Sequence, residues 1–491
     1  MGMIGGGEGS FIGAIHRAAI GLDGLIELAA GAFSSNPDTA LISGQNLFLN
    51  NERIYSSFES MIKTEASLPK SKRIDFVSIV TPNHIHFEPA KLALEHGFHV
   101  VIEKPFTFTL DEALHLRTLA KEKNLLLCVT HTYSGYPLVK EARSRVANGC
   151  LGKIRKIYVE YPQGWLSTPL ELTGNKQASW RTNPNTSGKG GALGDIGTHA
   201  AHLAQYISGL KITAVCADVQ ILVPNRQLDD DIAVLLKFQN EASGVLVASQ
   251  IATGEENNLK IKIYGEAGGL EWRQHEPNSL THISLDKPTQ IIRSGSNFTN
   301  ILSPSALHAC RTPSGHPEGY IEAFANIYKN FALTLRATLN KEEPNPIWLD
   351  FPNADDGVFG KVFFGFPPWR MPFGGHQQVC KSPLLCKLPY FHLLPKPLYK
   401  FMLKTFGEMN STVLALMEVR ETKLSIASFQ AMIRKSELTI IKETLYLINP
   451  NYDIKFGLRP QVLPAFLNIP FFKDFFTTAY YGIAMRKDAP V

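Results

Sequence analysis

The chain has 491 residues, of which 44% are hydrophobic and 19% are charged. This length exceeds one ordinary hydrophobic core, and the composition is typical of globular domains and excludes a disordered chain. The formal net charge of +5 comes from basic residues spread along the sequence, so we expect no nucleic-acid partner. The chain begins without a basic stretch followed by an apolar run, and the apolar segment 463–485 is interrupted by a proline and two charges. We therefore expect no secretory signal and no membrane span.

The six cysteines form no CxxC pair, which argues against a zinc site and favours a reducing, cytoplasmic location. Three consecutive acids, Asp229, Asp230 and Asp231, have the composition of a metal cluster. Consecutive acids in a turn are more often a solvated corner, so we expect no metal.

Residues 1–133 alternate short apolar runs with helical stretches, the pattern of a Rossmann-type doubly wound parallel sheet. The expected helices are 12–22, 87–97 and 109–124, and the expected strands are 1–4, 26–33, 74–80, 98–105 and 125–131. Ligands bind at the carboxyl ends of such strands. We therefore interpret residues 1–133 as a dinucleotide-binding domain.

A glycine-rich turn follows the first strand and contains Gly5, Gly6, Gly7 and Gly9. Glycines at a strand-to-helix turn let the backbone approach a pyrophosphate, whose charge the helix N-terminus stabilises. A strict GxGxxG pattern fails because Ser10 occupies the third glycine position. A bare turn without a ligand remains the alternative.

The second strand is followed by Ser34 and Ser35 instead of an acidic residue. A carboxylate at this position would bind the ribose hydroxyls of NAD, and its absence leaves less to repel the 2′-phosphate of NADP. No arginine stands beside the serines to attract that phosphate. The cofactor is therefore NAD or NADP, and the sequence leaves the choice open.

Residues 134–357 predict an α+β substrate domain. Extended, alternating segments follow one another at short spacing, which indicates one open antiparallel sheet with a solvated or oligomeric face. A helix over 317–339 follows. The expected strands are 153–165, 213–222, 232–239, 243–251, 259–272 and 281–286.

Three residues have the chemistry that oxidation of an alcohol needs. His199 is the candidate base, since the ordinary pKa of histidine lies near neutral pH. Asp195 precedes it by four residues, a helical spacing that places both on one face, where the carboxylate orients the imidazole or contacts the substrate. Lys104, held before Pro105, is a cationic donor for the substrate oxygen. Each residue alone is more often structural, so the argument depends on their joint occurrence.

The chain resembles the Gfo/Idh/MocA oxidoreductases in four motifs and in their order: the glycine turn, 81-TPNHIH-86, 103-EKP-105 and 195-DIGTH-199. The resemblance implies an NAD(P)-dependent dehydrogenase or reductase of a sugar or cyclitol, with Lys104, Asp195 and His199 lining its site. It also implies a homo-oligomer formed through the open sheet. The residues that it places at the cofactor are Thr81, Pro82, Asn83, His86, Glu103 and Lys104.

Three further residues are candidates for substrate contact. Trp180 and Arg181 begin a glycine-rich loop that leads to Asp195, and packing or a surface charge is the alternative explanation for them. His316, at the start of a helix, is at least as often structural.

Residues 358–491 have a different pattern, and the resemblance to the oxidoreductases stops near residue 357. The segment 353–360 resembles the start of the family's final helix, but prolines follow soon after it. The remainder resembles a partial α/β fragment of a class I S-adenosylmethionine-dependent methyltransferase, with a strand and loop at 360–378, a helix at 423–436, and strands at 437–450 and 473–485. No second glycine-rich strand–turn–helix lies between 358 and 491, so the cofactor-binding half of such an enzyme is absent.

A gene fusion, a recombined locus or a chimera of sequence assembly would each explain this join. Because both partners are cut inside an element, we favour an accidental or recent join. Two alternative functions follow from it. One is a degraded, non-catalytic nucleotide-binding chimera. The other is a methyltransferase, which the absence of the cofactor-binding half argues against.

Overall fold

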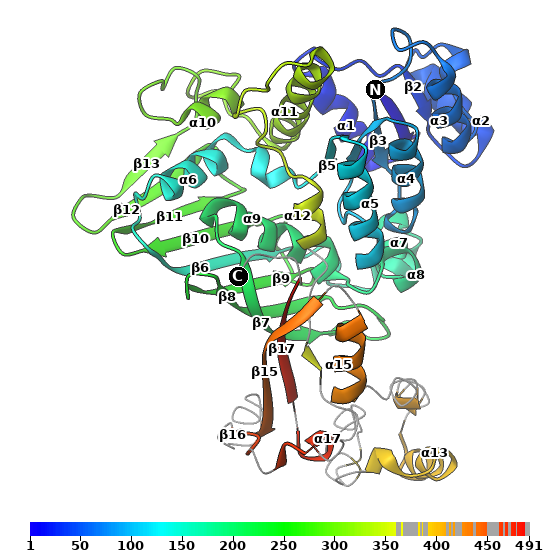
Figure 1. Ribbon diagram of the computed structural model, residues 1–491, viewed down its shortest axis with the longest axis vertical. Helices are drawn as coiled ribbons and strands as arrows, with labels where there is room; N and C mark the ends of the chain where they lie inside the picture. Colours follow the sequence, from blue (N-terminus) through cyan, green and yellow to red (C-terminus); the bar gives the residue numbers. More distant parts are fainter. Residues whose placement is uncertain are drawn as a thin grey trace. The chain divides into compact units, whose positions relative to one another are not determined.

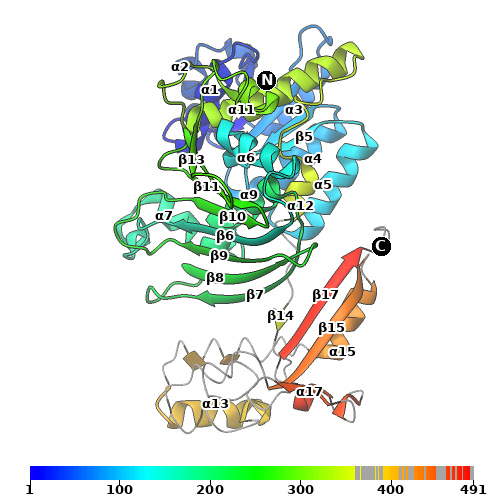
Figure 2. The ribbon, with the colours of Figure 1, turned by 90° about the vertical axis from the view of Figure 1, so that its left-hand side faces the viewer.

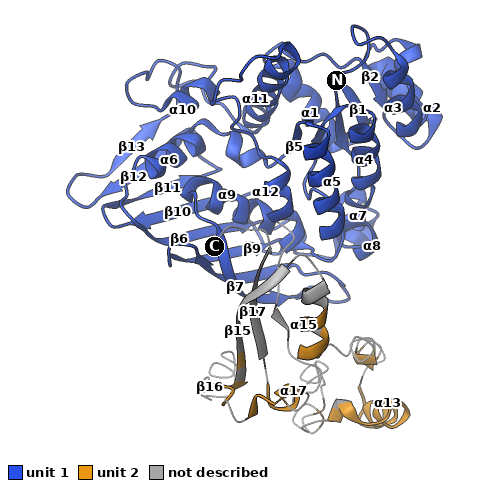
Figure 3. Cartoon of the chain, in the orientation of Figure 1, with its two compact units in different colours: residues 1–362 blue, residues 363–491 orange. Residues whose placement is uncertain are grey.

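The computed structural model divides into two compact units, residues 1–362 and 363–491, and each is described by itself (Figure 3). Across the described part of the chain, no helix has the length and apolar character needed to cross a membrane. The structure describes residues 1–359, 365–366, 382, 385, 391–408, 412–413, 416–417, 425–435, 438–448, 461–464, 467–469, 473–477 and 479–486.

The first sheet has five parallel strands in the order β2-β1-β3-β4-β5, which confirms the predicted doubly wound fold (Figure 1). All residues of β2 to β5 are buried, as parallel strands covered on both faces should be. The strands are β1 (Gly2–Gly5), β2 (Ala30–Ala32), β3 (Phe76–Val80), β4 (His99–Ile102) and β5 (Leu127–Val129).

Helices cover both faces of this sheet. One face carries a core to which α3 (Phe58–Ser67), α4 (Phe87–Glu95) and α5 (Leu110–Glu122) contribute, and α2 (Pro37–Asn46) follows β2. The other face carries α1 (Phe11–Gly21) together with the long helix α11 (Tyr320–Asn340). The aromatic side chains Phe324 and Phe331 of α11 are buried in the same core as Met3 and Phe76 of the sheet. The chain therefore returns to the first sheet after it has built the second.

The second sheet has eight strands in the order β13-β12-β11-β10-β6-β9-β8-β7 (Figure 2). The expectation of an antiparallel sheet is wrong for one pair, because β6 and β9 run parallel. After β6 the chain passes through several helices and forms β7 and β8. The next strand, β9, then pairs with β6 and runs in the same direction. The strands are β6 (Ile154–Pro162), β7 (Ile212–Gln220), β8 (Asp231–Phe238), β9 (Ser243–Ser249), β10 (Lys260–Gly265), β11 (Gly268–Arg273), β12 (Ser279–Ser284) and β13 (Gln290–Arg293).

The segment 259–272, expected as one strand, forms the antiparallel pair β10 and β11. The turn between them ends at Gly268, where a Cβ atom would lie 2.2 Å from the carbonyl oxygen of Ile283. A glycine is therefore required at this position, and the chain reverses immediately before it.

One face of the eight-stranded sheet packs against helices and the other remains open. Buried side chains of β6 and β10 join a core with α6 (Pro137–Ala147) and α9 (Thr198–Ser208). On the opposite face, Tyr158 and Leu235 are exposed. The alternation along each strand produces this division into two faces.

In the second unit, β14 (Gly365–Phe366), β17 (Ala479–Arg486), β15 (Leu438–Ile448) and β16 (Gln461–Val462) form an antiparallel sheet in that order. Helix α15 (Ile426–Lys435) and strand β15 lie where a helix and a strand were expected. The expected strand 473–485 begins only at Ala479, because Lys473–Phe476 forms the short helix α17. Most of the expected strand and loop over 360–378 lies outside the described residues.

Candidate functional site

The glycine turn connects β1 to α1 with a left-handed backbone at Gly5, Gly6 and Gly9, where φ is +80°, +73° and +77°. Helix α1 begins after Ser10, whose hydroxyl accepts a hydrogen bond from the backbone N–H of Gly13. A Cβ atom at Gly13 would lie 2.4 Å from the Cα of Gly6. Gly13 therefore lets the helix approach the strand, a role that sequence reasoning had sought at position 10.

Around this turn, the backbone N–H of Gly7 donates to the carbonyl of Phe33 at the end of β2. The next residue, Ser34, uses its hydroxyl to accept a hydrogen bond from Asn36, whereas Ser35 is exposed. The described loop thus brings the glycines beside the two serines, and no carboxylate stands in their place.

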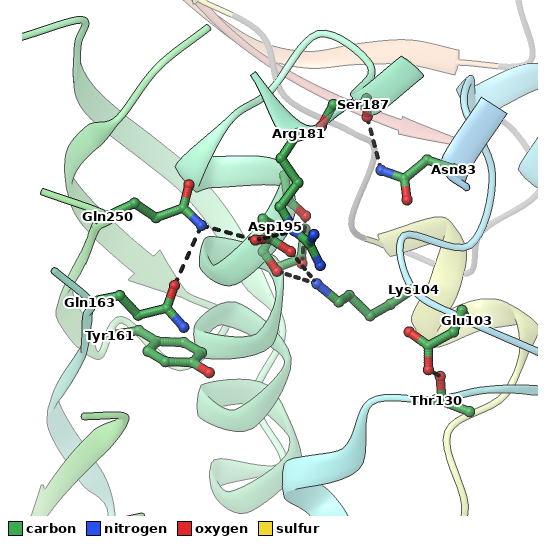
Figure 4. A network of polar contacts seen from close by, with 12 residues as sticks. Asn83, Glu103, Lys104, Thr130, Tyr161, Gln163, Arg181, Ser187, Asp195 and Gln250 are labelled. Atoms are coloured by element: carbon green, nitrogen blue, oxygen red, sulfur yellow. Dashed lines mark hydrogen bonds and ion pairs between the residues drawn. The ribbon is translucent and has the colours of Figure 1, made fainter. Parts of the chain in front are cut away.

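The turn after β3 lies against the glycine turn: a Cβ atom at Gly5 would be 3.0 Å from Cγ2 of Thr81. The hydroxyl of Thr81 is buried and has no hydrogen-bond partner among the described residues. Asn83 donates its amide to the carbonyl of Ser187 at 3.0 Å (Figure 4). The ring nitrogens of His86 each lie 2.9 Å from a carbonyl oxygen, those of Pro105 and Thr81, and Pro82 is exposed.

The two residues that follow β4 make separate sets of contacts. Glu103 is buried and accepts a hydrogen bond from Thr130 at 2.5 Å, with Nε2 of His16 on α1 at 2.9 Å. Burial opposes the charge, but His16 and Thr130 outweigh it and lower the pKa of this carboxyl. The other ring nitrogen of His16 lies 2.6 Å from the hydroxyl of Tyr328 on α11. The carboxylate of Glu103 therefore ties the end of β4 to two helices.

Lys104 meets Asp195 from the other sheet's domain. Its ammonium donates to Oδ1 of Asp195 at 2.7 Å and to the carbonyl oxygen of the same residue at 2.6 Å (Figure 4). The second carboxylate oxygen accepts from Gln250 at 2.9 Å and lies 3.4 Å from Nε of Arg181. Although burial opposes ionisation, Lys104 and Arg181 hold the pKa of Asp195 well below its usual range. Asp195 therefore remains a carboxylate.

Asp195 lies in a π-helical turn, Leu193–Gly197, directly before α9. No hydrogen bond among the described residues joins it to His199, which gives no support to the first of its two expected roles, that of orienting the imidazole. Contact between Asp195 and the substrate, the other expected role, stays a prediction. The wider turn directs the carboxylate to Lys104 and Gln250 instead.

The loop before this turn is held by Asp229, whose two carboxylate oxygens accept from the backbone N–H groups of Gly191 and Leu193, each at 2.6 Å. Asp230 is also buried and accepts from the backbone of residues 222 and 223. The expectation of a solvated acidic corner is therefore wrong for both residues. Their burial depends on backbone donors from distant segments, which sequence reasoning could not place.

His199 is buried against aromatic rings. The ring of Tyr133 stands perpendicular to it at 4.9 Å between centroids, and that of His131 at 5.7 Å. Its Nδ1 is buried without a hydrogen-bond partner in the described part of the chain. Burial, and secondarily the charge of Lys104, hold the pKa of His199 well below its ordinary value. The imidazole is therefore neutral.

The predicted substrate residues are placed differently from one another. Arg181, at the end of α7 (Lys176–Arg181), lies over the ring of Trp180 at 4.2 Å and reaches Asp195. His316 is exposed in the turn before α11, and its backbone hydrogen bonds are to Pro313 and Thr312. Within the described residues none of its hydrogen bonds reaches Lys104, Asp195 or His199.

Sequence reasoning missed a set of polar side chains that face Asp195 from the second sheet. Gln163 and Gln250 follow β6 and β9, and their side chains are joined by a hydrogen bond of 3.4 Å (Figure 4). Gln163 also donates to Asn257 at 2.6 Å, and Asn257 accepts from Tyr161 at 2.7 Å. A polar residue directly after each of two adjacent parallel strands was the available signal.

A five-stranded dinucleotide-binding sheet, an eight-stranded sheet and a lysine–carboxylate pair between their domains define a class of nicotinamide-dependent oxidoreductase. Residues 2–131 match the oxidoreductase family with an NAD-binding Rossmann fold, and residues 139–271 match the GFO/IDH/MocA C-terminal domain. The uncharacterized oxidoreductase YfiI of Bacillus subtilis is 33% identical over 361 residues, which cover 73% of this chain and 91% of that protein. The chain therefore belongs to the Gfo/Idh/MocA family of oxidoreductases.

Two further proteins extend the comparison. Levoglucosan dehydrogenase of Pseudarthrobacter phenanthrenivorans is 28% identical over 310 residues, which cover 57% of this chain and 75% of that protein. The structure of an inositol dehydrogenase homolog from Azotobacter vinelandii complexed with NAD+ has a TM-score of 0.69 and 35% identity, and covers 73% of this chain and 91% of its own. These similarities give no support to the methyltransferase resemblance of the C-terminal segment.

Proposed function

We propose that this oxidoreductase transfers a hydride between a nicotinamide cofactor and a secondary hydroxyl of a sugar or cyclitol. The observation that carries the proposal is the Lys104–Asp195 pair, formed between the two domains, beside the neutral imidazole of His199. Similar proteins support the substrate class: one is a levoglucosan dehydrogenase, and another was crystallised with NADH and myo-inositol.

The residues around the glycine turn fit a dinucleotide. The left-handed glycines give the backbone close access to a diphosphate at the start of α1, and the buried, unpartnered hydroxyl of Thr81 lies against that turn. A bound nicotinamide supplies the hydride acceptor. Ser34 and Ser35 would lie nearest the ribose, and we retain both NAD and NADP as cofactors.

In the proposed mechanism, Lys104 donates a hydrogen bond to the substrate oxygen and stabilises the negative charge that develops on it. Asp195 holds the ammonium in place and stays ionised, because two cations face it. His199 takes the hydroxyl proton on its imidazole. Arg181, together with Trp180, contacts the ring of the substrate, and His316 remains a candidate for that contact.

A direct experiment is a fluorescence titration with NADH and NADPH, followed by a screen of sugars and inositols that records absorbance of the reduced cofactor. We expect saturable binding of at least one cofactor and turnover of at least one polyol. Flat titrations with both cofactors would contradict the proposal and favour the degraded, non-catalytic chimera.

We also propose that the open face of the eight-stranded sheet forms a homo-oligomer. Val245, Val247 and Tyr264 line a groove on this face with Tyr158, and Leu235 is 60% exposed nearby on β8. Glu160, Lys260 and Lys262 line the same groove, so this face combines apolar and charged side chains, as interfaces between copies of a chain do. Light scattering should give a mass above one chain, and Leu235→Glu should lower it; a monomeric wild type would contradict this assignment.

We place the protein in the cytoplasm. The cysteines that the structure describes, Cys128, Cys150, Cys216 and Cys310, are free thiols. Thiols that stay unpaired are expected in a reducing compartment. Cell fractionation with an antibody to the chain tests this location.

A further inference from the structure

The two carboxylate oxygens of Asp195 are held by neighbours of different kinds (Figure 4). Its Oδ1 accepts a hydrogen bond from the ammonium of Lys104 at 2.7 Å, and its Oδ2 accepts one from the side-chain amide of Gln250 at 2.9 Å. Nε of Arg181 lies farther from Oδ2, at 3.4 Å. Gln250 therefore makes the shorter of the two contacts to the oxygen that Lys104 does not bind.

The position of Gln250 is fixed by its backbone. Gln250 directly follows β9 and is 3% exposed. Its backbone N–H donates to the carbonyl of Asp230 at 2.9 Å, and its carbonyl accepts from the backbone N–H of Leu166 at 3.1 Å. Arg181, in contrast, ends the short helix α7, and its side chain is 24% exposed. Groups at strand ends are held more precisely than groups on loops, so Gln250 is the rigid anchor of Asp195.

Glutamine has the chemistry that this position needs. Its amide donates a hydrogen bond to the carboxylate and adds no third cation to Lys104 and Arg181, the two that already face Asp195. A lysine at position 250 would compete with Lys104 for the charge of Asp195. A leucine would leave Oδ2 without its nearest donor, and a buried acceptor that loses its donor is unfavourable.

The orientation of Asp195 determines the direction in which Lys104 donates. An ammonium has three N–H donors. Among the described residues, the acceptors of Lys104 are the Oδ1 and the carbonyl oxygen of Asp195, at 2.7 Å and 2.6 Å. Two bonds to one residue fix the ammonium, and its third N–H is left for a substrate oxygen. Rotation of the carboxylate would break one of these bonds and turn the third N–H away.

We propose that Gln250 is a positioning residue for hydride transfer, an inference that rests on the proposed dehydrogenase activity. Its amide holds one carboxylate oxygen of Asp195, so that the other oxygen stays on Lys104. The ammonium is thereby presented to the substrate oxygen in a single direction. Gln250 acts through Asp195 and Lys104 and does not itself contact the reacting atoms.

Gln250→Met tests this role by removal of the donor, because methionine has nearly the length of glutamine and carries no charge. We expect kcat to fall ~10–100-fold, the usual effect of a misplaced catalytic group, while the affinity for NADH measured by fluorescence stays unchanged. This variant decides the matter if the next one does not fold.

Gln250→Glu is the sharper test, because it makes the same contact depend on pH. The introduced carboxyl donates an O–H to Asp195 when it is protonated, as the amide does. When it is ionised it has no donor and repels the carboxylate of Asp195. Two carboxyl groups at hydrogen-bond distance retain one proton above ~4.3, the ordinary pKa of a glutamate.

The other charged groups around Gln250 act in both directions. Asp229 and Asp230 favour the protonated form of the introduced carboxyl, as burial does, whereas Arg181 and Arg226 favour the ionised form. Arg226 already pairs with Asp230. We therefore expect the kcat of Gln250→Glu, relative to wild type at the same pH, to rise ~5-fold from about pH 8 to about pH 5.5. The relative kcat of Gln250→Met should stay constant.

The matched control is Gln290→Glu, the same substitution at an exposed position on β13, whose relative kcat should be near one at every pH. A purely structural role of Gln250 would lower activity equally at every pH. A constant relative kcat of Gln250→Glu therefore overturns the proposal, as does a kcat of Gln250→Met within twofold of wild type or an equal loss of NADH affinity. A wild-type protein that oxidises no sugar or cyclitol overturns the proposed function, and the role of Gln250 with it.

Discussion

The site has two sides of different construction. On the side of the parallel sheet, the candidate groups directly follow buried strands, and Glu103 next to Lys104 is engaged by His16 and Thr130. On the side of the eight-stranded sheet, Asp195 and His199 lie on a π-helical turn and a helix, and Nδ1 of His199 lacks a partner in the described structure. We propose that the first side holds the cofactor and that the second exchanges a proton with the substrate.

The largest expected effect is on turnover, and it tests whether the two sides of the site act separately. His199→Ala should lower turnover ~10²–10⁴-fold, because proton abstraction loses its base, and should leave NADH affinity unchanged. Stopped-flow kinetics and a fluorescence titration measure the two quantities. His275→Ala, at an exposed position, is the control. Equal losses in turnover and cofactor affinity would show that the two sides are not separate.

Lys104→Met should come next, with a loss of ~10²–10³-fold in kcat/KM, the usual effect of removing one donor to a developing oxyanion. Methionine keeps most of the length of the side chain and removes its charge. The loss of Lys104 should also raise the pKa of Asp195, since Lys104 is the largest favourable influence on that carboxylate. Activity within threefold of wild type would assign the donor role elsewhere.

Asp229→Asn tests whether a distant contact positions the proton side. Asparagine has a single carboxamide oxygen and cannot accept from both Gly191 and Leu193. We expect a loss of ~1–3 kcal/mol in the free energy of unfolding, the usual cost of an unsatisfied buried group, and a fall in kcat with cofactor affinity retained. Asp286→Asn, at an exposed position, is the control. An unaltered unfolding curve would show that Asp229 does not hold the loop.

The same contrast explains what the sequence could predict. Local signals worked for the first sheet. Thr109 and Glu112 form a capping box at the start of α5, where a helix was expected, and the parallel direction of the strands follows from the alternation of strands and helices. Lys104 and Asp195 were named as candidates from their order along the chain, and the structure brings them together.

The geometry of the second side could not be predicted, because it depends on contacts between residues that are far apart in the sequence. The burial of Asp229 requires donors from residues 191 and 193, and the partners of Asp195 include Gln250, 55 positions away. The π-helical turn has no sequence signature of its own. The buried histidines of α9 did leave a signal, since His199, His202 and Tyr206 recur at helical spacing, with Tyr206 stacked on His202.

A smaller effect is expected in the pH dependence of stability. Burial lowers the pKa of His202 to about 3, whereas an unfolded histidine titrates near ~6.5. Below pH ~6.5 the histidine of the unfolded chain binds a proton that the histidine of the folded chain does not. The free energy of unfolding therefore falls as pH falls. The slope is ~1.4 kcal/mol per pH unit for each such histidine, and His131 and His199 add to it in the same direction.

Urea unfolding at pH 6 and pH 5 measures this slope. His202→Phe should reduce the loss between the two values by ~1 kcal/mol, because one proton fewer is taken up on unfolding. His275→Asn should leave it unchanged. A variant that loses as much stability as the wild type would mean that His202 is already protonated in the folded state.

The last prediction concerns the C-terminal segment, where we expect no effect. Residues 358–491 contain no glycine-rich strand–turn–helix, and a methyltransferase-like sheet needs such a turn to hold its cofactor. Calorimetric titration of the full chain with S-adenosylmethionine should therefore give only heats of dilution, while NADH or NADPH in the same experiment gives a saturable signal. The nicotinamide titration shows that the protein is folded, so a flat S-adenosylmethionine titration has a clear meaning. Saturable binding at micromolar ligand would show that the segment carries a second cofactor site, and that the join unites two working parts.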